Sequence, residues 1–325
     1  MKKNTLAVFD PDEEYVTKLM SYMNDSRSVP LEIQGFTDKD LLKEYMRGND
    51  IDILLIPEDD LDDDIEACEK GEMMVLSEND GARDGRGHKA ICKYQSSENI
   101  MREVMCYYAE QPFMEAGQIS SVNTEIITIY SPIRRSFRTS FAFALGEVLS
   151  EKEKVLYLNL EEFSGFNQLL QKNFMSDLSD LLFYIEQKKR NFPCKLASMV
   201  EKAGHLDYIP PVISPPDLLS VSRETWILLF NELGGCDYSK IVVDLSDSIS
   251  AFLDVLMASK LIYMPVREDT VSRAKIEQYE AMLKIMEYGE ILNKTKKLSI
   301  PFMNELNGNL YTLSDSPMGD FVRSL

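Results

Sequence analysis

The stretch Ile-Ile-Thr-Ile-Tyr-Ser-Pro-Ile-Arg-Arg-Ser-Phe-Arg-Thr (126–139) joins an apolar run to a helical pattern. Apolar residues after it, among them Phe141 and Leu145, share one helical face. This order of strand, loop and helix is the context of a phosphate-binding loop. Such loops use glycines so that backbone N–H groups can curl around phosphate, yet Ser131–Thr139 contains none. The stretch therefore predicts an α/β fold whose phosphate site keeps its frame and lacks its usual residues.

Working outward, the alternation of apolar runs and long helical patterns continues from Glu125 to near the end of the chain. Helices are predicted at Asp217–Leu233, ended by two glycines, and at roughly Asp269–Leu292. This rhythm predicts a doubly wound α/β domain over residues 125–325. The predicted strands are Ile126–Tyr130, Val155–Leu160, Ile241–Leu245, Leu261–Met264 and a final one near Leu298–Phe302.

Residues 1–112 show the same alternation on a smaller scale, which predicts a parallel five-stranded sheet of the flavodoxin-like type. A helix over 97–110 is expected to close this domain, and residues 113–124, with glycine and serines, are predicted to be a linker. The predicted strands are Leu6–Phe9, Leu31–Phe36, Ile51–Ile56, Met73–Leu76 and Ala90–Cys92.

Polar residues follow several of these strands: Asp10 and Asp12 the first, Ser77 the fourth and Lys93 the fifth. This arrangement resembles the receiver domains of bacterial two-component signalling. The resemblance implies that the two aspartates would hold Mg²⁺, that Ser77 would supply a hydroxyl, and that Lys93 would contact a phosphoryl group. These four residues are the predicted receiver-like pocket.

The end of the third strand departs from that pattern, because Pro57 stands where receivers carry the phospho-accepting aspartate. Proline has no nucleophile, so phosphorylation is not expected. A shift in the alignment would bring Asp59 or Asp60 into the position instead. The acidic run Glu58–Asp64 is otherwise interpreted as a solvated loop.

The composition excludes several classes of function. A formal charge of -19 and a pI near 4.6 argue against nucleic-acid binding and favour a basic partner surface. The five cysteines are scattered without a Cys-x-x-Cys pair and are interpreted as reduced thiols. The two histidines, His88 and His205, lack metal-ligand spacing, so neither a zinc site nor a histidine-dependent triad is predicted. No catalytic residue and no metal ligand is assigned.

No apolar stretch is long enough for a membrane span, and the N-terminus lacks the apolar core of a secretion signal. The expected location is therefore cytoplasmic, with recruitment to a cell pole or a membrane-associated complex through a partner rather than by direct membrane insertion.

The second domain resembles the MinD/ParA branch of P-loop ATPases. Within that branch the chain resembles the pilus-assembly localisation proteins called CpaE or TadZ, which join a receiver-like domain to such an ATPase. Four stretches in order carry this resemblance, and together with the receiver-like first domain the match spans nearly the whole chain. They are Ile-Thr-Ile-Tyr-Ser-Pro (127–132), Lys-Val-Leu-Tyr-Leu-Asn-Leu-Glu (154–161), Leu-Asp-Tyr-Ile-Pro-Pro (206–211) and Lys-Ile-Val-Val-Asp-Leu-Ser-Asp (240–247).

The resemblance implies a signature lysine at Ile133, glycines at Arg134, Arg135 and Phe137, and a phosphate-binding lysine at Arg138. Only Thr139, the expected Mg²⁺ ligand, is unchanged. Arg138 keeps a positive charge, and a guanidinium can bind phosphate oxygens in a bidentate fashion. The missing lysine is the one that, in the family, reaches the partner subunit's nucleotide and supports hydrolysis.

Asp244 ends an apolar strand at the position of the Walker B aspartate; it is either a Mg²⁺ residue or an acid at the end of a strand. Glu161 and Asp247 are expected near the same edge. The cluster of Arg134, Arg135 and Arg138 also allows two interpretations, an anion or nucleotide site at a helix N-terminus or a solvated basic patch that docks an acidic surface.

Taken together, the residues and the resemblance favour a non-enzymatic scaffold, acting as a homodimer, that localises or assembles a Tad/Flp-type pilus secretion machine by protein docking. The alternative is an atypical ATPase in which Arg138, Thr139 and Asp244 hold ATP and Mg²⁺. A cell-division or flagellar positioning factor of the same superfamily is a further alternative.

Overall fold

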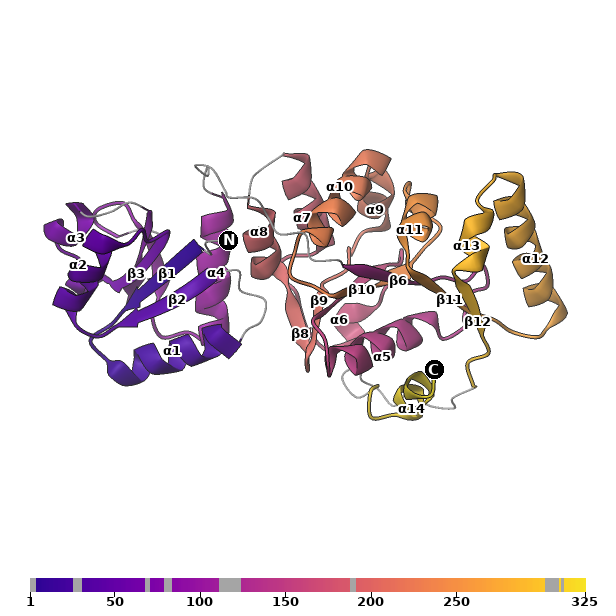
Figure 1. Cartoon of the computed structure of the whole chain (residues 1–325), viewed down its shortest axis with the longest axis horizontal. Coiled ribbons are helices and arrows are strands. Elements are labelled where there is room, and N and C mark those ends of the chain that lie inside the picture. The colour runs from indigo at the N-terminus through magenta and orange to yellow at the C-terminus, as the bar shows by residue number, and fades with distance from the viewer. Residues whose placement is uncertain are drawn as a thin grey trace. The chain divides into compact units, whose positions relative to one another are not determined.

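The computed structural model describes residues 4–25, 31–67, 71–78, 84–110, 124–187, 191–301, 310 and 313–325. The chain divides into two compact units, one made of Met1–Ile119 with Lys189–Ser198 and the other of Ser120–Lys188 with Met199–Leu325. Both units are α/β, as predicted (Figure 1). The predicted linker, residues 113–124, lies outside the described residues except for Thr124.

The first unit contains a five-stranded sheet in the order β2-β1-β3-β4-β5, with every neighbouring pair parallel. The five predicted strands are confirmed, with shifts at their ends. The strands are β1 (Asn4–Phe9), β2 (Leu31–Phe36), β3 (Ile53–Pro57), β4 (Glu72–Ser77) and β5 (Lys89–Cys92).

Helices cover both faces of this sheet, which is why its strands read as continuous apolar runs. One apolar cluster joins α1 and α4 to the sheet and another joins α2 and α3 to its opposite face. Cys194 of α8, far along the chain, is buried in the first of these clusters. The helices are α1 (Glu13–Asp25), α2 (Lys39–Gly48), α3 (Asp63–Ala67), α4 (Ser97–Glu110) and α8 (Phe192–Met199), with a 3₁₀ turn η1 (Glu58–Asp60).

The second unit is built on a seven-stranded sheet in the order β12-β11-β6-β10-β7-β9-β8. All pairs are parallel except β8 with β9, which form an antiparallel hairpin at one edge. The strands are β6 (Glu125–Ile129), β7 (Val155–Leu160), β8 (Glu201–Ala203), β9 (Leu206–Ile209), β10 (Lys240–Leu245), β11 (Leu261–Pro265) and β12 (Thr295–Leu298).

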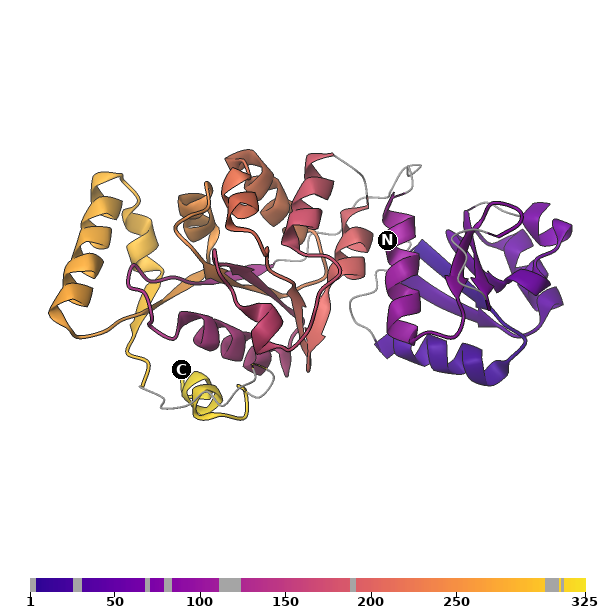
Figure 2. The same ribbon diagram turned by 180° about the vertical axis from the view of Figure 1, so that it is seen from behind.

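Helices α7, α9, α10 and α11 lie on one side of this sheet, and α5 and α14 lie on the other (Figures 1 and 2). The helices are α5 (Arg138–Ser150), α6 (Phe166–Leu169), α7 (Leu178–Glu186), α9 (Pro215–Ser220), α10 (Arg223–Gly234), α11 (Phe252–Ala258), α12 (Thr270–Ile285), α13 (Gly289–Asn293) and α14 (Pro317–Arg323).

Three sequence predictions for this unit are wrong in detail. The final strand is Thr295–Leu298 rather than Leu298–Phe302, because it is an edge strand whose residues need no continuous apolar run. The helix predicted at 217–233 is two helices, since the Ser222 side chain caps a new start by accepting the Thr225 N–H. The long helix after Asp269 ends at Ile285, where Glu287 adopts a left-handed φ of 65°.

Helix α5 is the centre of the second unit. Its residues from Phe141 to Glu147 are all buried, because the sheet lies on one side and α14 packs against the other (Figure 2). The sequence pattern predicts a single apolar face, so the covering by α14 is an addition. This burial fixes the start of α5, and with it the preceding loop, at the carboxyl ends of β6 and β10.

Candidate functional site

The loop between β6 and α5 contains no glycine, yet its backbone adopts angles that glycine usually provides. Arg135 has a φ of 57° and Phe137 a φ of 59°, both in the left-handed region. Residues with a Cβ resist this region by about 1–2 kcal/mol each. These are two of the three positions where the resemblance implies glycine. The loop shape is therefore retained against the local preference of its residues.

Buried contacts hold the loop in this shape. The Ser131 hydroxyl donates to the carbonyl oxygen of Pro265 at 2.6 Å and accepts the N–H of Ile133 at 3.3 Å. Ile133, where the resemblance implies a lysine, is an apolar side chain buried in the unit. Phe137 packs against the main apolar cluster. The loop is thus anchored at both ends by the core of the unit.

Arg138, the first residue of α5, is held by two acidic residues at the carboxyl ends of neighbouring strands, Asp244 in β10 and Glu161 just after β7. Its Nε lies 3.0 Å from Oδ1 of Asp244, and its Nη2 contacts Oε1 of Glu161. The Asp244 side chain is 0% exposed. Asn159 also donates to Asp244 at 3.4 Å. The guanidinium therefore pairs with both carboxylates from within the chain.

Burial raises the pKa of Asp244, and the charge of Arg138 together with a hydrogen bond from Thr139 opposes that rise. A buried carboxylate is costly unless it is paired. Arg138 and Thr139 supply this pairing. The predicted set Arg138, Thr139 and Asp244 is therefore brought together, with Arg138 and Thr139 both directed at the Asp244 carboxylate.

A cavity of about 680 Å³ lies in front of the loop and is lined by Arg134, Arg135, Arg138 and Thr139. Glu161 and Asp247, expected at this edge, also line it. Among the described residues, no ion pair involves Arg134 or Arg135, and both side chains are exposed. The three arginines thus share one cavity, but only Arg138 is paired.

Sequence reasoning missed several residues of this cavity, among them Phe163 and Arg267. Phe163 is largely exposed, and Arg267 follows β11. A signal was available for both, because each lies directly beyond the carboxyl end of a strand, where side chains of a parallel sheet converge.

The receiver-like pocket of the first unit is also closed by an internal ion pair. Lys93 Nζ lies 2.6 Å from Oδ2 of the fully buried Asp10 and 4.9 Å from the centre of the Tyr15 ring. Asp12 accepts the backbone N–H groups of Glu14 and Tyr15 and so caps α1. Of the predicted pocket, Asp10 and Lys93 are joined, while the Asp12 side chain serves the helix.

Pro57 is the last residue of β3, and Glu58–Asp60 form the following 3₁₀ turn. Ser77 is the last residue of β4, and its carbonyl oxygen accepts the N–H of Lys93 at 2.8 Å. Within the described ranges, no group of three or more His, Cys, Asp or Glu side chains is placed to hold a metal ion. No described helix is long and apolar enough to cross a membrane.

Comparison with known families assigns the first unit to a family of domains. Residues 1–109 match the family described as TadZ-like, receiver domain. The first domain is a TadZ-like receiver domain. No curated protein matches the chain.

One of the solved structures similar to this chain shows the fold of the second domain. A ParA family ATPase from Chlorobium tepidum TLS aligns with a TM-score of 0.50 and 16% identity, over 62% of this chain and 99% of that one. A plasmid partition protein from Borrelia burgdorferi B31 bound to AMPPNP aligns with a TM-score of 0.44 and 17% identity, over 63% and 100%. The MinD cell division protein of Aquifex aeolicus gives 0.42 and 16%, over 55% and 70%. The TadZ-like receiver domain followed by a ParA-type fold matches a CpaE/TadZ-like architecture.

Proposed function

We propose that this protein is a scaffold of a Tad/Flp-type pilus secretion machine, acting by protein docking and without nucleotide turnover. It would act in the cytoplasm as a homodimer and reach a pole or a membrane complex through a partner. The CpaE/TadZ-like architecture supports the cellular role, and the geometry of the two degenerate sites supports the mechanism.

The observation that carries the mechanism is the pairing of Arg138 with Asp244 and Glu161. For Asp244 to serve a Mg²⁺ ion, Arg138 would have to leave a fully buried carboxylate. Breaking a buried pair costs about 3 kcal/mol or more, which corresponds to roughly a hundredfold loss of affinity. The side chains at Arg135 and Phe137 add bulk where glycines would let phosphate approach. The residues present therefore do not fit Mg-ATP.

The first domain supports the same conclusion. Lys93 is engaged by Asp10, and the end of β3 offers a proline instead of a carboxylate. Incubation with acetyl phosphate and Mg²⁺ is expected to leave the protein unmodified. A mass increase of one phosphoryl group at Asp59 or Asp60 would overturn this part of the proposal.

Isothermal titration with Mg-ATP tests the proposal as a whole. We expect no saturable heat up to millimolar ATP. Saturable binding that disappears in Arg138→Ala would overturn it and establish the alternative. Arg134→Ala is the matched control, since it removes an equal charge from the same cavity without touching Asp244.

The second candidate is an atypical ATPase, and the retained shape of the loop is the observation that favours it. The left-handed conformations at Arg135 and Phe137 keep backbone N–H groups available, and the cavity has the size of a small-molecule site. A positioning factor for division or flagella is a third candidate. Neighbouring genes for a pilus secretion ATPase and prepilin would separate it from the first.

A further inference from the structure

Helices α7 and α10 of the second unit pack side by side at its surface (Figures 1 and 2). The hydroxyl of Thr225, at the start of α10, donates to Oε1 of Glu186, at the end of α7, at 3.1 Å. Because the end of one helix meets the start of the other, the pair runs antiparallel. This contact fixes which residues of α7 and α10 lie beside one another.

One turn from this contact, each helix presents a large apolar side chain to solvent. Phe183 of α7 is 62% exposed and Leu228 of α10 is 43% exposed. In the antiparallel register both lie three residues from the bonded pair, and so at the same level. The inward faces are already filled, since Leu182 and Leu229 are buried. Phe183 and Leu228 thus lie outside the buried rows of their helices and form an apolar centre on the outside.

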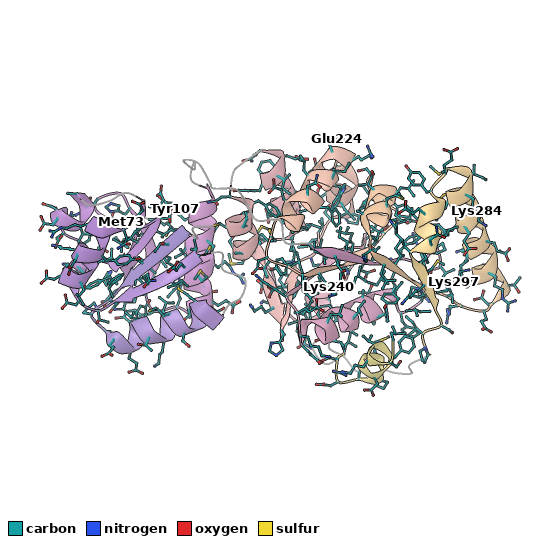
Figure 3. The ribbon with its side chains drawn as sticks, in the orientation of Figure 1. Met73, Tyr107, Glu224, Lys240, Lys284 and Lys297 are labelled. Carbon is teal, nitrogen blue, oxygen red and sulfur yellow. The ribbon has the colours of Figure 1, made fainter. Side chains whose placement is uncertain are left out.

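Acidic side chains flank this apolar centre at both ends. Glu186 and Glu224 lie at one end, and Asp180 and Glu232 lie at the other; all four residues are exposed. Figure 3 shows Glu224 on the outer side of the unit. Within the described ranges, no ion pair involves any of the four. This helix face, defined by these four acids with Phe183 and Leu228, is named the α7–α10 face.

Neutralising charges are scarce on the α7–α10 face. Arg223 is the only basic residue on either helix, and Asp254 of α11 holds its guanidinium through two bonds of 2.7 and 2.5 Å. The basic residues 188–190, which follow α7 in the sequence, lie outside the described residues. Among the residues that the structure describes, the face therefore combines an exposed apolar centre with acidic side chains at each end that form no ion pair.

We propose that the α7–α10 face is a docking surface for a basic amphipathic segment of a partner protein. A helix with apolar residues spaced by three or four positions would place them over Phe183 and Leu228. Lysines or arginines on either side would then meet the four acids. Charge complementarity selects this occupant over a second copy, because two such faces would bring eight carboxylates together. It selects against anionic lipid for the same reason.

The inference rests on the proposed docking function, but its test uses no nucleotide, so the two can fail separately. The probe is a fluorescein-labelled synthetic peptide about four helical turns long, with leucines at spacings of three and four and lysines elsewhere. The full chain is titrated into it and followed by anisotropy. A peptide with glutamates in place of the lysines, and vesicles of anionic lipid, are run in parallel.

We expect the basic peptide to bind, and the double variant Phe183→Gln/Leu228→Gln to weaken binding at least about tenfold, because it removes the apolar centre without altering charge. Glu224→Gln/Glu232→Gln should weaken it too, with a smaller salt dependence. The matched control Glu277→Gln/Ile285→Gln on α12 removes one exposed charge and one exposed apolar residue elsewhere and should bind like the wild type.

Three results would overturn the inference. Equal binding to the wild type and to Phe183→Gln/Leu228→Gln would mean that the peptide responds only to the overall charge of -19. No binding of the basic peptide, or preferred binding of the acidic peptide or the vesicles, would mean that the occupant is of another class. A loss of self-association in Phe183→Gln/Leu228→Gln, measured by sedimentation, would assign the face to a second copy instead.

Discussion

Glu147 provides the sharpest test of the packing in the second unit. It lies on α5, and only 7% of its surface is exposed. Its Oε2 accepts the N–H of Ser314 at 2.9 Å. Burial is the main cause that raises its pKa from 4.5 to about 7, and the Ser314 bond opposes the rise. The folded chain therefore keeps the carboxyl protonated at a pH where the unfolded chain releases the proton.

This difference between the folded and unfolded pKa sets how stability changes with pH. Below pH 4.5 both states hold the proton and burial of the carboxyl costs little. As the pH rises toward 7, the unfolded state is favoured, so the stability of the second unit falls. A shift from 4.5 to about 7 corresponds to about 3 kcal/mol at most. Since Glu147 keeps 7% of its surface exposed and solvent screens the charge in part, we expect about 1–2 kcal/mol.

Glu147→Gln should remove this fall, because the amide cannot ionise and its oxygen can still accept the Ser314 N–H. At pH 8 the variant should be more stable than the wild type by about 1–2 kcal/mol, and the gain should shrink toward pH 5. Urea unfolding followed by the fluorescence of Trp226, the only tryptophan and fully buried in this unit, measures it. Glu151→Gln, whose carboxylate pairs with Arg323 near the surface, should change stability by under about 0.5 kcal/mol. A Glu147→Gln variant that is no more stable at pH 8, or equally stabilised at pH 5, would refute the reasoning.

Further predictions concern the two degenerate sites. Arg135→Gly should be more stable than Arg135→Ala by about 1 kcal/mol in the same assay, because glycine accepts the left-handed angle; the reverse order would show that the loop is unstrained. Asp244→Ala should destabilise the second unit by about 3 kcal/mol, and adding Arg138→Met should restore part of the loss; no restoration would contradict the pairing. Lys93→Met should speed hydrogen exchange in β1 by leaving Asp10 buried and unpaired, whereas Lys93→Arg should not; equal exchange in both variants would contradict this role.

Much of the fold follows from local patterns in the sequence. The strands of both sheets are continuous apolar runs because helices cover both faces, so most of them could be located from these runs alone. The hairpin of β8 and β9 was not predicted, because β8 is three residues long and includes Lys202. The break before α10 depends on a serine cap that a helical apolar pattern conceals.

The sequence could predict which residues meet at the site, but not how their side chains pair there. Arg138, Thr139 and Asp244 could be named from the resemblance to P-loop ATPases, and they meet because a helix start and a strand end lie at the same edge of a parallel sheet. That Arg138 would turn inward to Asp244 and Glu161 depends on distances between three separate elements. The left-handed angles at Arg135 and Phe137 run against the preference of those residues, so no local rule could give them.

The Ser131 anchor and the buried Ile133 carry a consequence for how such a domain changes over time. A loop held by its ends can lose its glycines one by one and still present the same outline to a partner. A partner could then still recognise that outline after the phosphate chemistry is lost. Each replaced glycine would lower the stability of the domain by a small, measurable amount without changing the shape of the loop.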